Sequence, residues 1–201
     1  MRVTKIELGP NKKYLISIED QFALFLYYRE LVQLEITEES ELTPEELARI
    51  KVEIEYPRAK KKAMDLLIRM DMCEQDVRSK LTRHSFSPDA IDQAIAYLYQ
   101  YHYLDDHRYA AHFIESKKHT KSKRAIAYEL QQKGVHASTI EDLLSDYQEE
   151  EKAIRRLILK KSSHPGELSY EEQNKIIASI CRKGFSYEKV RQCMRDIESQ
   201  V

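Results

Sequence analysis

The segment KLTRHSFSPDAIDQAIAYL, residues 80–98, recurs in diverged form twice more, as ELQQKGVHASTIEDLLSDY at 129–147 and as SICRKGFSYEKVRQCMRDI at 179–197. The copies start 49 and then 50 residues apart. Each reads as the end of one helix, a tight turn and a second amphipathic helix. Internal similarity at this period indicates stacked helical units, each too small to bury its apolar face alone.

Apolar residues occupy equivalent positions in the three copies, at steps of five residues. Another apolar residue precedes each set by four positions, at Val77, Ile126 and Ile176. This spacing places one side chain of each helix on the inward face of the repeat. We therefore expect nine residues to be buried: Leu81, Phe86, Ile91, Leu130, Val135, Ile140, Ile180, Phe185 and Val190.

The repeats predict a mainly α fold of three tandem three-helix repeats in an elongated curved array, with a small N-terminal β-containing element. In this division, residues 1–56 are a strand-containing acidic extension. The helical repeats are residues 57–104, 105–148 and 149–201. Such an array would offer a long surface suited to gripping a long partner.

The first 57 residues differ in composition from the rest. Runs rich in branched and aromatic residues, RVTKIEL, YLISIED and FALFLYY, surround a Gly-Pro-Asn turn at 9–11 and read as short strands. A helix is expected to begin at Thr43, with Pro44 at its first position, and to break or bend near Pro57. Twelve acids against seven bases make this segment negative, so the remainder of the chain is net positive.

The overall composition, with 33% charged and 42% apolar residues, four glycines and no tryptophan, fits amphipathic helices with solvated faces. The cysteines at 73, 181 and 193 form no CxxC pair, which predicts buried thiols in a reducing compartment. The sequence has neither a charged-then-apolar leader nor a long apolar run. We therefore expect a cytoplasmic protein that does not contact a membrane, and a monomer.

Candidate catalytic and metal-binding residues are few. His102, His107 and His112 are five residues apart and lack the i, i+4 spacing that puts two imidazoles on one helix face. Asp105 and Asp106 stand at a helix start, where carboxylates compensate the helix dipole. No phosphate-binding loop, GxGxxG or nucleophile motif is present. The sequence thus predicts no enzymatic activity, no catalytic residue, no metal site and no cofactor.

Basic side chains are the stronger candidates for a binding role. Segment 116–134 holds six of them against Glu129 alone, a charge of +5 in nineteen residues. The runs RAKKK at 58–62 and RRLILKK at 155–161, and an Arg-Lys pair at 182–183, repeat the feature near similar helix ends. Solvated helix faces can explain such runs. The unmixed sign in the second repeat and the recurrence favour a surface for a polyanion or an acidic filament groove.

The segment YLDDHRYAAHFIESKKHTKSKRAIAYELQQKGV, from Tyr103 to Val135, closely resembles the central signature of the RecX family of bacterial regulators of the RecA recombinase. That signature has an aromatic or Phe-Leu-Asp-Asp start, Arg-Tyr-Ala, an apolar helix, a basic turn and an Arg-Ile-x-x-Glu-Leu-x-x-Lys-Gly helix. Thr120 and Ser122 stand where the family usually has glycine, and His84-Ser85 replaces a Lys-Gly pair of the first repeat. The matching residues are Leu104, Asp105, Asp106, Arg108, Tyr109, Ala110, Phe113, Ile114, Glu129, Leu130, Lys133 and Gly134.

The resemblance implies a non-enzymatic protein that binds RecA filaments on DNA and curbs their ATPase and strand-exchange activities, in recombination, DNA repair and the SOS response. Single- and double-stranded DNA, bound weakly and without sequence preference, are the other implied partners. The alternatives are a sequence-independent or helix-turn-helix DNA-binding regulator without a recombinase partner, and a plain helical scaffold. The helices at 87–98 and 137–147 are poorly suited to reading DNA bases, because they carry acids and no cluster of Arg, Asn or Gln. The candidate residues for binding DNA and the filament are Arg108, Lys117, Lys118, Lys121, Lys123, Arg124, Lys133, Arg155, Arg156, Lys160, Lys161, Arg182 and Lys183.

Overall fold

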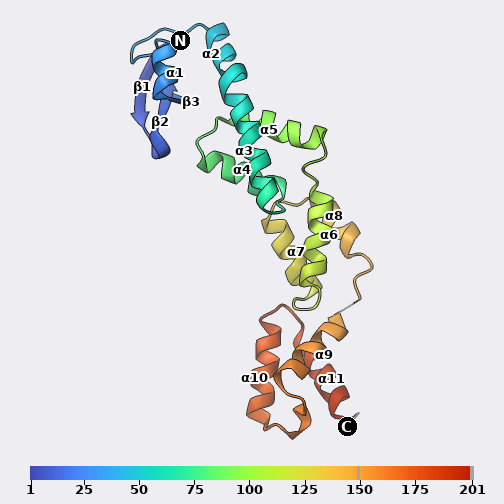
Figure 1. Ribbon diagram of the computed structural model, residues 1–201. Helices are drawn as coiled ribbons and strands as arrows, with labels where there is room; N and C mark the ends of the chain where they lie inside the picture. The colour runs from blue at the N-terminus through green and yellow to red at the C-terminus, as the bar shows by residue number, and fades with distance from the viewer. Residues whose placement is uncertain (149, 200–201) are drawn as a thin grey trace. The chain divides into compact units, whose positions relative to one another are not determined.

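The computed structural model describes residues 1–148 and 150–199, and it is mainly helical with a small N-terminal sheet (Figure 1). The chain divides into two compact units, Met1–Asp105 and Asp106–Val201. The first unit holds the sheet and one set of three helices, and the second unit holds two further sets. The predicted fold class, three helical repeats behind a β-containing element, is confirmed.

The sheet consists of β1 (Val3–Leu8), β2 (Lys13–Ile18) and β3 (Gln21–Tyr27), which are antiparallel and lie in that order. The short helix α1 (Tyr28–Gln33) follows directly. Because side chains alternate along a strand, the sheet has two apolar faces. One face joins a core with α1 and the helix after it, and the other contributes Phe25 to the core of the first repeat.

The helix predicted at Thr43 is confirmed, because the Thr43 hydroxyl accepts a hydrogen bond from the Glu46 backbone N–H at 3.1 Å. It begins as α2 (Pro44–Ile50), widens into a π-helical segment (Lys51–Glu55) and continues as α3 (Tyr56–Arg69). Of the break or bend expected near Pro57, the break does not occur, because the helical backbone continues through the proline. The widened turn directly precedes the proline, so the helical hydrogen bonding is altered where Pro57 has no N–H to donate. The boundary expected between residues 56 and 57 falls inside this helical run.

Each repeat contains three helices. In the first, α3 is followed by α4 (Glu74–Arg83) and α5 (Pro88–Gln100). The second consists of α6 (Asp106–Lys117), α7 (Lys123–Gln132) and α8 (Ala137–Leu144). The third consists of α9 (Glu150–Lys161), α10 (Tyr170–Cys181) and α11 (Tyr187–Glu198).

The turn between the second and third helices has the same backbone conformation in every repeat. Ser85, Gly134 and Gly184 occupy it with φ of 62°, 78° and 92°, in the left-handed region. The chain thus closes the second helix of each repeat in the same way, although the first repeat places a serine where glycine is favoured.

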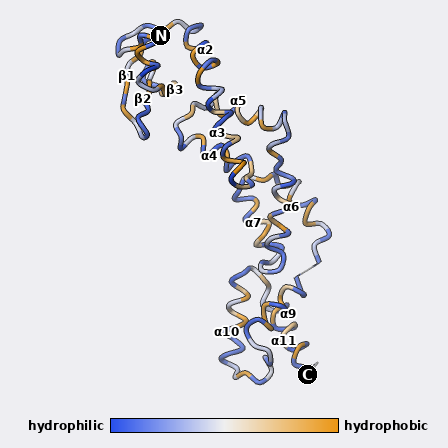
Figure 2. The backbone as a smooth tube through the Cα atoms, viewed as in Figure 1, coloured by the Kyte–Doolittle hydropathy of each residue, from blue (hydrophilic) through white to orange (hydrophobic). Residues whose placement is uncertain are grey.

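The apolar pattern read from the repeats is confirmed, since all nine expected core residues are buried. Of the upstream set, Val77 and Ile126 are buried, whereas Ile176 is half-buried and its neighbour Ile177 takes the inward position. Hydrophobic and hydrophilic residues alternate along the helices, as amphipathic packing requires (Figure 2). All three cysteines lie within the described ranges as free thiols, Cys73 and Cys193 buried and Cys181 half-buried.

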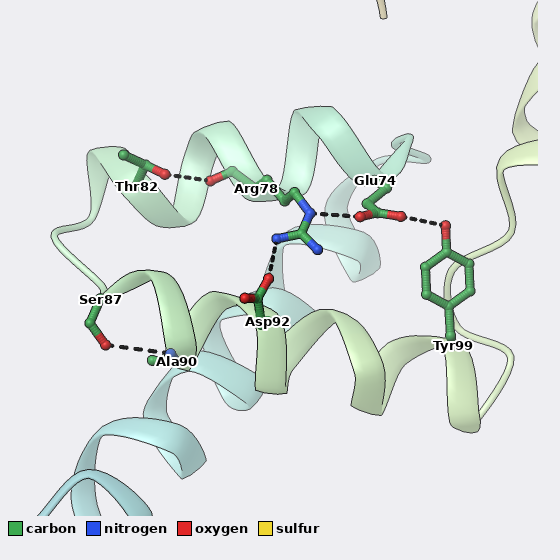
Figure 3. A network of polar contacts seen from close by, with 7 residues as sticks. All are labelled: Glu74, Arg78, Thr82, Ser87, Ala90, Asp92 and Tyr99. Carbon is green, nitrogen blue, oxygen red and sulfur yellow. Dashed lines mark hydrogen bonds and ion pairs between the residues drawn. The ribbon is translucent and has the colours of Figure 1, made fainter. Parts of the chain in front are cut away.

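A polar network ties α4 to α5 in the first repeat (Figure 3). Arg78 donates from Nε to Glu74 and from Nη1 to Asp92, both at 2.6 Å. The Tyr99 hydroxyl donates to the second Glu74 oxygen at 2.8 Å. These partners come from both helices, so the network fixes one helix against the other in addition to the apolar core.

Glu55, at the end of the π-helical segment, is fully buried and holds the start of α5. Its carboxylate accepts hydrogen bonds from the Ser87 backbone N–H at 2.9 Å and from the Ser87 hydroxyl at 2.8 Å. The same hydroxyl accepts from the Ala90 N–H and so caps α5 (Figure 3). Burial raises the pKa of Glu55, and the Ser87 hydrogen bonds oppose that rise.

Truncating the buried residue that follows each turn should lower stability more where the side chain is larger. Phe86→Ala and Phe185→Ala should each lower the free energy of unfolding by about 3 to 5 kcal/mol, because both rings are buried just after the turn. Val135→Ala removes fewer buried atoms and should cost less, about 1 to 3 kcal/mol. Urea unfolding followed by circular dichroism measures all three. Equal or negligible losses would contradict the assignment of these residues as core anchors.

Replacing Glu55 should change how stability depends on pH. A carboxyl group with a raised pKa binds its proton more tightly in the folded state, so its contribution to stability falls as pH rises from the ordinary value of 4.5 through the raised one. Glu55→Gln keeps an acceptor for Ser87 and removes this titration. The unfolding free energy of wild type minus that of the variant should therefore decrease with rising pH, and a difference that is flat or increases would refute the assignment.

Candidate functional site

The thirteen basic residues proposed as binding candidates all lie in the second unit, whereas the basic run at 58–62 lies on α3 in the first unit. The candidates fall into three groups. One occupies the turn between α6 and α7, one lies where the second repeat meets the third, and the remainder is distributed along helices.

The turn between α6 and α7 is held by hydrogen bonds to lysine carbonyl oxygens. The Lys117 carbonyl accepts from the backbone N–H of Thr120 at 2.8 Å, and the Lys118 carbonyl accepts from the Tyr147 hydroxyl at 2.9 Å. Ser122 then caps α7 by accepting from the Ala125 N–H at 3.1 Å. The Thr120 hydroxyl also donates to the Lys117 carbonyl oxygen at 3.2 Å, so the side chains of Thr120 and Ser122 have structural roles in closing the turn and starting the helix.

Several lysines of this turn have nearby carboxylate or aromatic partners. Lys121 forms an ion pair with Glu129, and Lys118 lies 2.8 Å from Glu115, three residues earlier on α6. The Lys117 Nζ lies 5.8 Å from the Phe113 ring centroid. The Lys133 Nζ lies 5.7 Å from that of Tyr109. Carboxylates thus lie close to Lys118 and Lys121, and helix spacing accounts for the Lys118 pair.

The second and third repeats meet at the start of α7. The Ser122 N–H donates to the Lys183 carbonyl oxygen at 3.2 Å, which brings the two turns together. Gly184 allows this contact, since an added Cβ would lie 2.5 Å from the Ser122 Oγ and 2.8 Å from the Ala125 Cβ. Glycine is thus required here both for its left-handed backbone and for close approach.

Glu150, the first residue of α9, completes this contact. Its carboxylate accepts from the Lys123 backbone N–H at 2.9 Å and from the Lys189 Nζ at 2.6 Å. This half-buried carboxylate therefore joins the start of α7 to α11 and raises the pKa of Lys189. It also compensates the dipoles of α7 and α9 at their N-termini.

We name this region the basic junction. The exposed side chains of Lys123 and Arg124 lie at the start of α7, Arg182 and the half-buried Lys183 lie on the turn after α10, and Lys189 lies on α11. Its one described carboxylate partner, Glu150, is already bound to Lys189 and to a backbone N–H. A cavity opens beside it, lined by Arg124, Ala125, Tyr128, Glu150, Cys181, Gly184, Phe185, Ser186 and Lys189.

The remaining basic residues are spread along helices. Arg155 lies 3.8 Å from Asp196, whereas Arg156 and Lys160 are exposed on α9. Lys161 is exposed at the end of α9, and Arg108 is exposed on α6. None of these is among the residues that line the junction cavity.

Lys189, Glu150 and Tyr128 belong to the junction but do not stand out in the sequence. Lys189 lies outside any basic run, and Glu150 reads as an ordinary acidic helix start. Tyr128 lines the cavity while 62% of its surface is exposed. Gly184, next to these residues, can be recognised in the sequence as a helix cap. The sequence does not show which surface packs against it.

Among the described residues, no three His, Cys, Asp or Glu side chains gather as a bound metal ion would need. None of the described helices is both long and apolar enough to cross a membrane.

The two turn glycines should respond differently to alanine. Gly134→Ala should cost about 1 to 2 kcal/mol, because alanine disfavours the left-handed backbone at this position. Gly184→Ala adds a clash with Ser122 and Ala125 and should cost a further 1 to 3 kcal/mol or so. Urea unfolding compares the two. Equal losses would mean that the contact between the turns is unimportant for stability.

Comparison with known proteins agrees with this architecture. Residues 59–98 match the model of the first three-helix domain of RecX, and residues 105–144 match that of the second. A crystal structure of regulatory protein RecX has a TM-score of 0.62 at 23% identity, covering 97% of this chain and 98% of the other. RecX from Lactobacillus salivarius has a TM-score of 0.61 at 24% identity over 72% of this chain and 97% of that one. These two likenesses concern the fold.

Sequence relatives extend the match to nearly the whole chain. The regulatory protein RecX of Caldanaerobacter subterraneus subsp. tengcongensis is 30% identical over 96% of this chain and 98% of its own length. That of Leuconostoc mesenteroides is 30% identical over 93% of this chain and 72% of its own. Because the repeats, the signature segment and these relatives agree, the chain belongs to the RecX family.

Proposed function

We propose that this protein binds RecA filaments on DNA and restrains their ATP hydrolysis and strand exchange, with roles in recombination, DNA repair and the SOS response. RecX membership supports a regulatory role. The observation that carries the proposal is the basic junction, where cations from two repeats surround a carboxylate that is already bound. A filament on DNA offers acidic protein and phosphate together, and contact through several repeats would add weak affinities.

In this proposal the exposed junction residues make the first contact with the polyanion. Lys123 and Arg124 are exposed at the N-terminus of α7, and no ion pair is found for either side chain within the described part of the chain. Lys118 and Lys121 lie close to carboxylates and so contribute less to that field. Arg156, Lys160 and Lys161 on α9 are assigned a secondary, non-specific role with DNA.

One observation favours the alternative of a DNA-binding regulator. Helix α11 borders a shallow groove in which Lys, Arg and Gln are side-chain types that read base edges. The lining residues are Tyr187, Glu188, Lys189, Arg191, Gln192 and Arg195. Gln192 and Arg195 are, however, hydrogen-bonded to each other at 2.8 Å, and Gln192 also donates to Asp196. Base reading would require these bonds to break, so we place this function second.

The proposal also covers the chemistry, oligomeric state, location and repeat boundaries of the protein. The protein acts without catalysis or a cofactor, as a monomer in the cytoplasm, through repeats bounded as predicted at residues 57, 105 and 149. An elongated, curved arrangement of the repeats would let one molecule span several filament subunits, and small-angle scattering tests that shape.

The decisive experiment is RecA-catalysed ATP hydrolysis on single-stranded DNA. Wild-type protein should slow hydrolysis at less than one molecule per recombinase subunit. Lys123→Glu with Arg124→Glu should raise the concentration needed for half-inhibition about tenfold or more, because two exposed cations become anions.

The matched control carries the same charge change elsewhere. Arg29→Glu with Arg49→Glu alters two exposed residues of the first unit and should leave inhibition nearly unchanged. If folded wild-type protein leaves hydrolysis untouched in excess, the recombinase proposal fails. A binding curve with strong preference for one duplex sequence, lost in Arg191→Ala, would then support the regulator alternative.

A further inference from the structure

The first unit contains a second cluster of cations, formed where the sheet packs on the first repeat. A cavity of about 370 Å³ opens there. Side chains from the sheet, from α3 and from the turn after α4 line it together. They are Asn11, Lys13, Phe25, Tyr27, Arg58, Lys61, Lys62, Asp65, His84 and Phe86. We call this the sheet pocket; it lies outside the basic junction and shares no residue with it.

Lys13 is the most unusual member. It is 7% exposed, and its Nζ lies 3.9 Å from the Phe25 ring centroid and donates to the His84 carbonyl oxygen. No carboxylate within ion-pair distance is found for it among the described residues. Burial lowers the pKa of Lys13, and the positive charges of Lys62 and Arg58 lower it further. A buried ammonium group beside other cations is costly unless an anion joins it.

Arg58 adds a donor without a partner. Its Nη2 forms an ion pair with Glu30 of α1, while its Nη1 is buried and has no hydrogen-bond acceptor among the described residues. The guanidinium carbon lies 4.9 Å from the Tyr27 ring centroid, which holds the planar group in place. A buried, unsatisfied donor on an oriented guanidinium is a group that a bound oxyanion would satisfy.

The other ionisable side chains of the sheet pocket are also mainly positively charged. Lys61 is exposed and Lys62 half-buried on the next turn of α3, and neither forms an ion pair within the described part of the chain. Burial lowers the pKa of the His84 imidazole, and Lys62, Lys13 and Lys80 lower it further. The carboxylate that lines the pocket, Asp65, is exposed. With Glu30 bound to Arg58, positive groups outnumber carboxylates here.

We propose that the sheet pocket binds a phosphate group, with Lys13, Arg58 and Lys62 as its main ligands. Their donors come from a strand and a helix and surround one small cavity, which suits a tetrahedral oxyanion better than a planar carboxylate. The phosphate could belong to a nucleic-acid backbone or be a free phosphate, and these sources are separated below. The proposal does not depend on the proposed function, because it concerns different residues of a different unit.

The test uses the full chain and three probes at fixed ionic strength: inorganic phosphate, a short single-stranded oligonucleotide and a glutamate-rich peptide. Binding is followed by the shift of the thermal unfolding midpoint and by the His84 imidazole resonance in proton NMR. Phosphate or the oligonucleotide should raise the midpoint of wild type beyond a chloride control and shift that resonance. A response to phosphate identifies a free-phosphate site, and a response to the oligonucleotide alone identifies a phosphodiester site.

Variants on α3 test whether phosphate binds in the sheet pocket. Lys61→Gln with Lys62→Gln should weaken binding by about tenfold or more, since charged hydrogen bonds are lost. Lys60→Gln on the same helix is the control, because the Lys60 Nζ faces α5, 5.3 Å from the Tyr97 ring centroid. The His84 resonance needs no variant, so it decides the matter if the double variant is unstable.

Three results would overturn the proposal. The first is no response of the His84 resonance to either phosphate probe. The second is equal weakening by Lys60→Gln and by the pocket variant, which would indicate general electrostatics. The third is a response to the glutamate-rich peptide alone, which would make the pocket a carboxylate site for an acidic protein.

Discussion

A single left-handed residue between the second and third helices sets the geometry of every repeat. Ser85, Gly134 and Gly184 reverse the chain in the same way, so the apolar residue that follows each of them is directed into the core. Gly184 has an additional constraint, because the turn of the third repeat lies against Ser122 at the start of α7. The turn that closes one repeat therefore also forms its contact with the preceding one, and any side chain there would affect both.

Pairing decides which cations of these helices are available to a partner. A helix rich in lysine and glutamate brings opposite charges together at spacings of three and four residues, and exposed pairs of this kind add little stability. Lys118 with Glu115 shows how such pairs reduce the positive field of a basic segment. Where two repeats meet, the surroundings differ, since Glu150 is already bound and Lys123 is exposed beside it. Counting charges along a sequence therefore overestimates the positive field of some segments and misses cationic surfaces formed by residues far apart in the chain.

The sequence predicts what is local or periodic in this protein. The three strands, the helix start at Thr43, the turn glycines and the nine core anchors follow from alternation, capping and repeat spacing. The widened helical turn before Pro57 could not be predicted, because such a turn has no sequence signature of its own. Glu150 meets Lys189 of its own repeat and the Lys123 backbone N–H of the preceding one, and neither partner is close to it in the chain. The residues that could not be predicted are those whose position depends on contacts between segments far apart in the chain.

The acidic extension gains its place in the fold through one face of its sheet. Alternation along β3 directs Leu24 and Leu26 to the core with α1, and directs Phe25 to the first repeat, where its ring centroid lies 5.2 Å from that of Phe86. Phe86 is itself positioned by the left-handed Ser85, so the sheet packs on a residue that the repeat geometry provides. The same alternation puts Lys13, on β2, beside that aromatic pair. A cation buried for this reason is a consequence of strand periodicity, and its location between two elements gives it access to a ligand that neither element would bind alone.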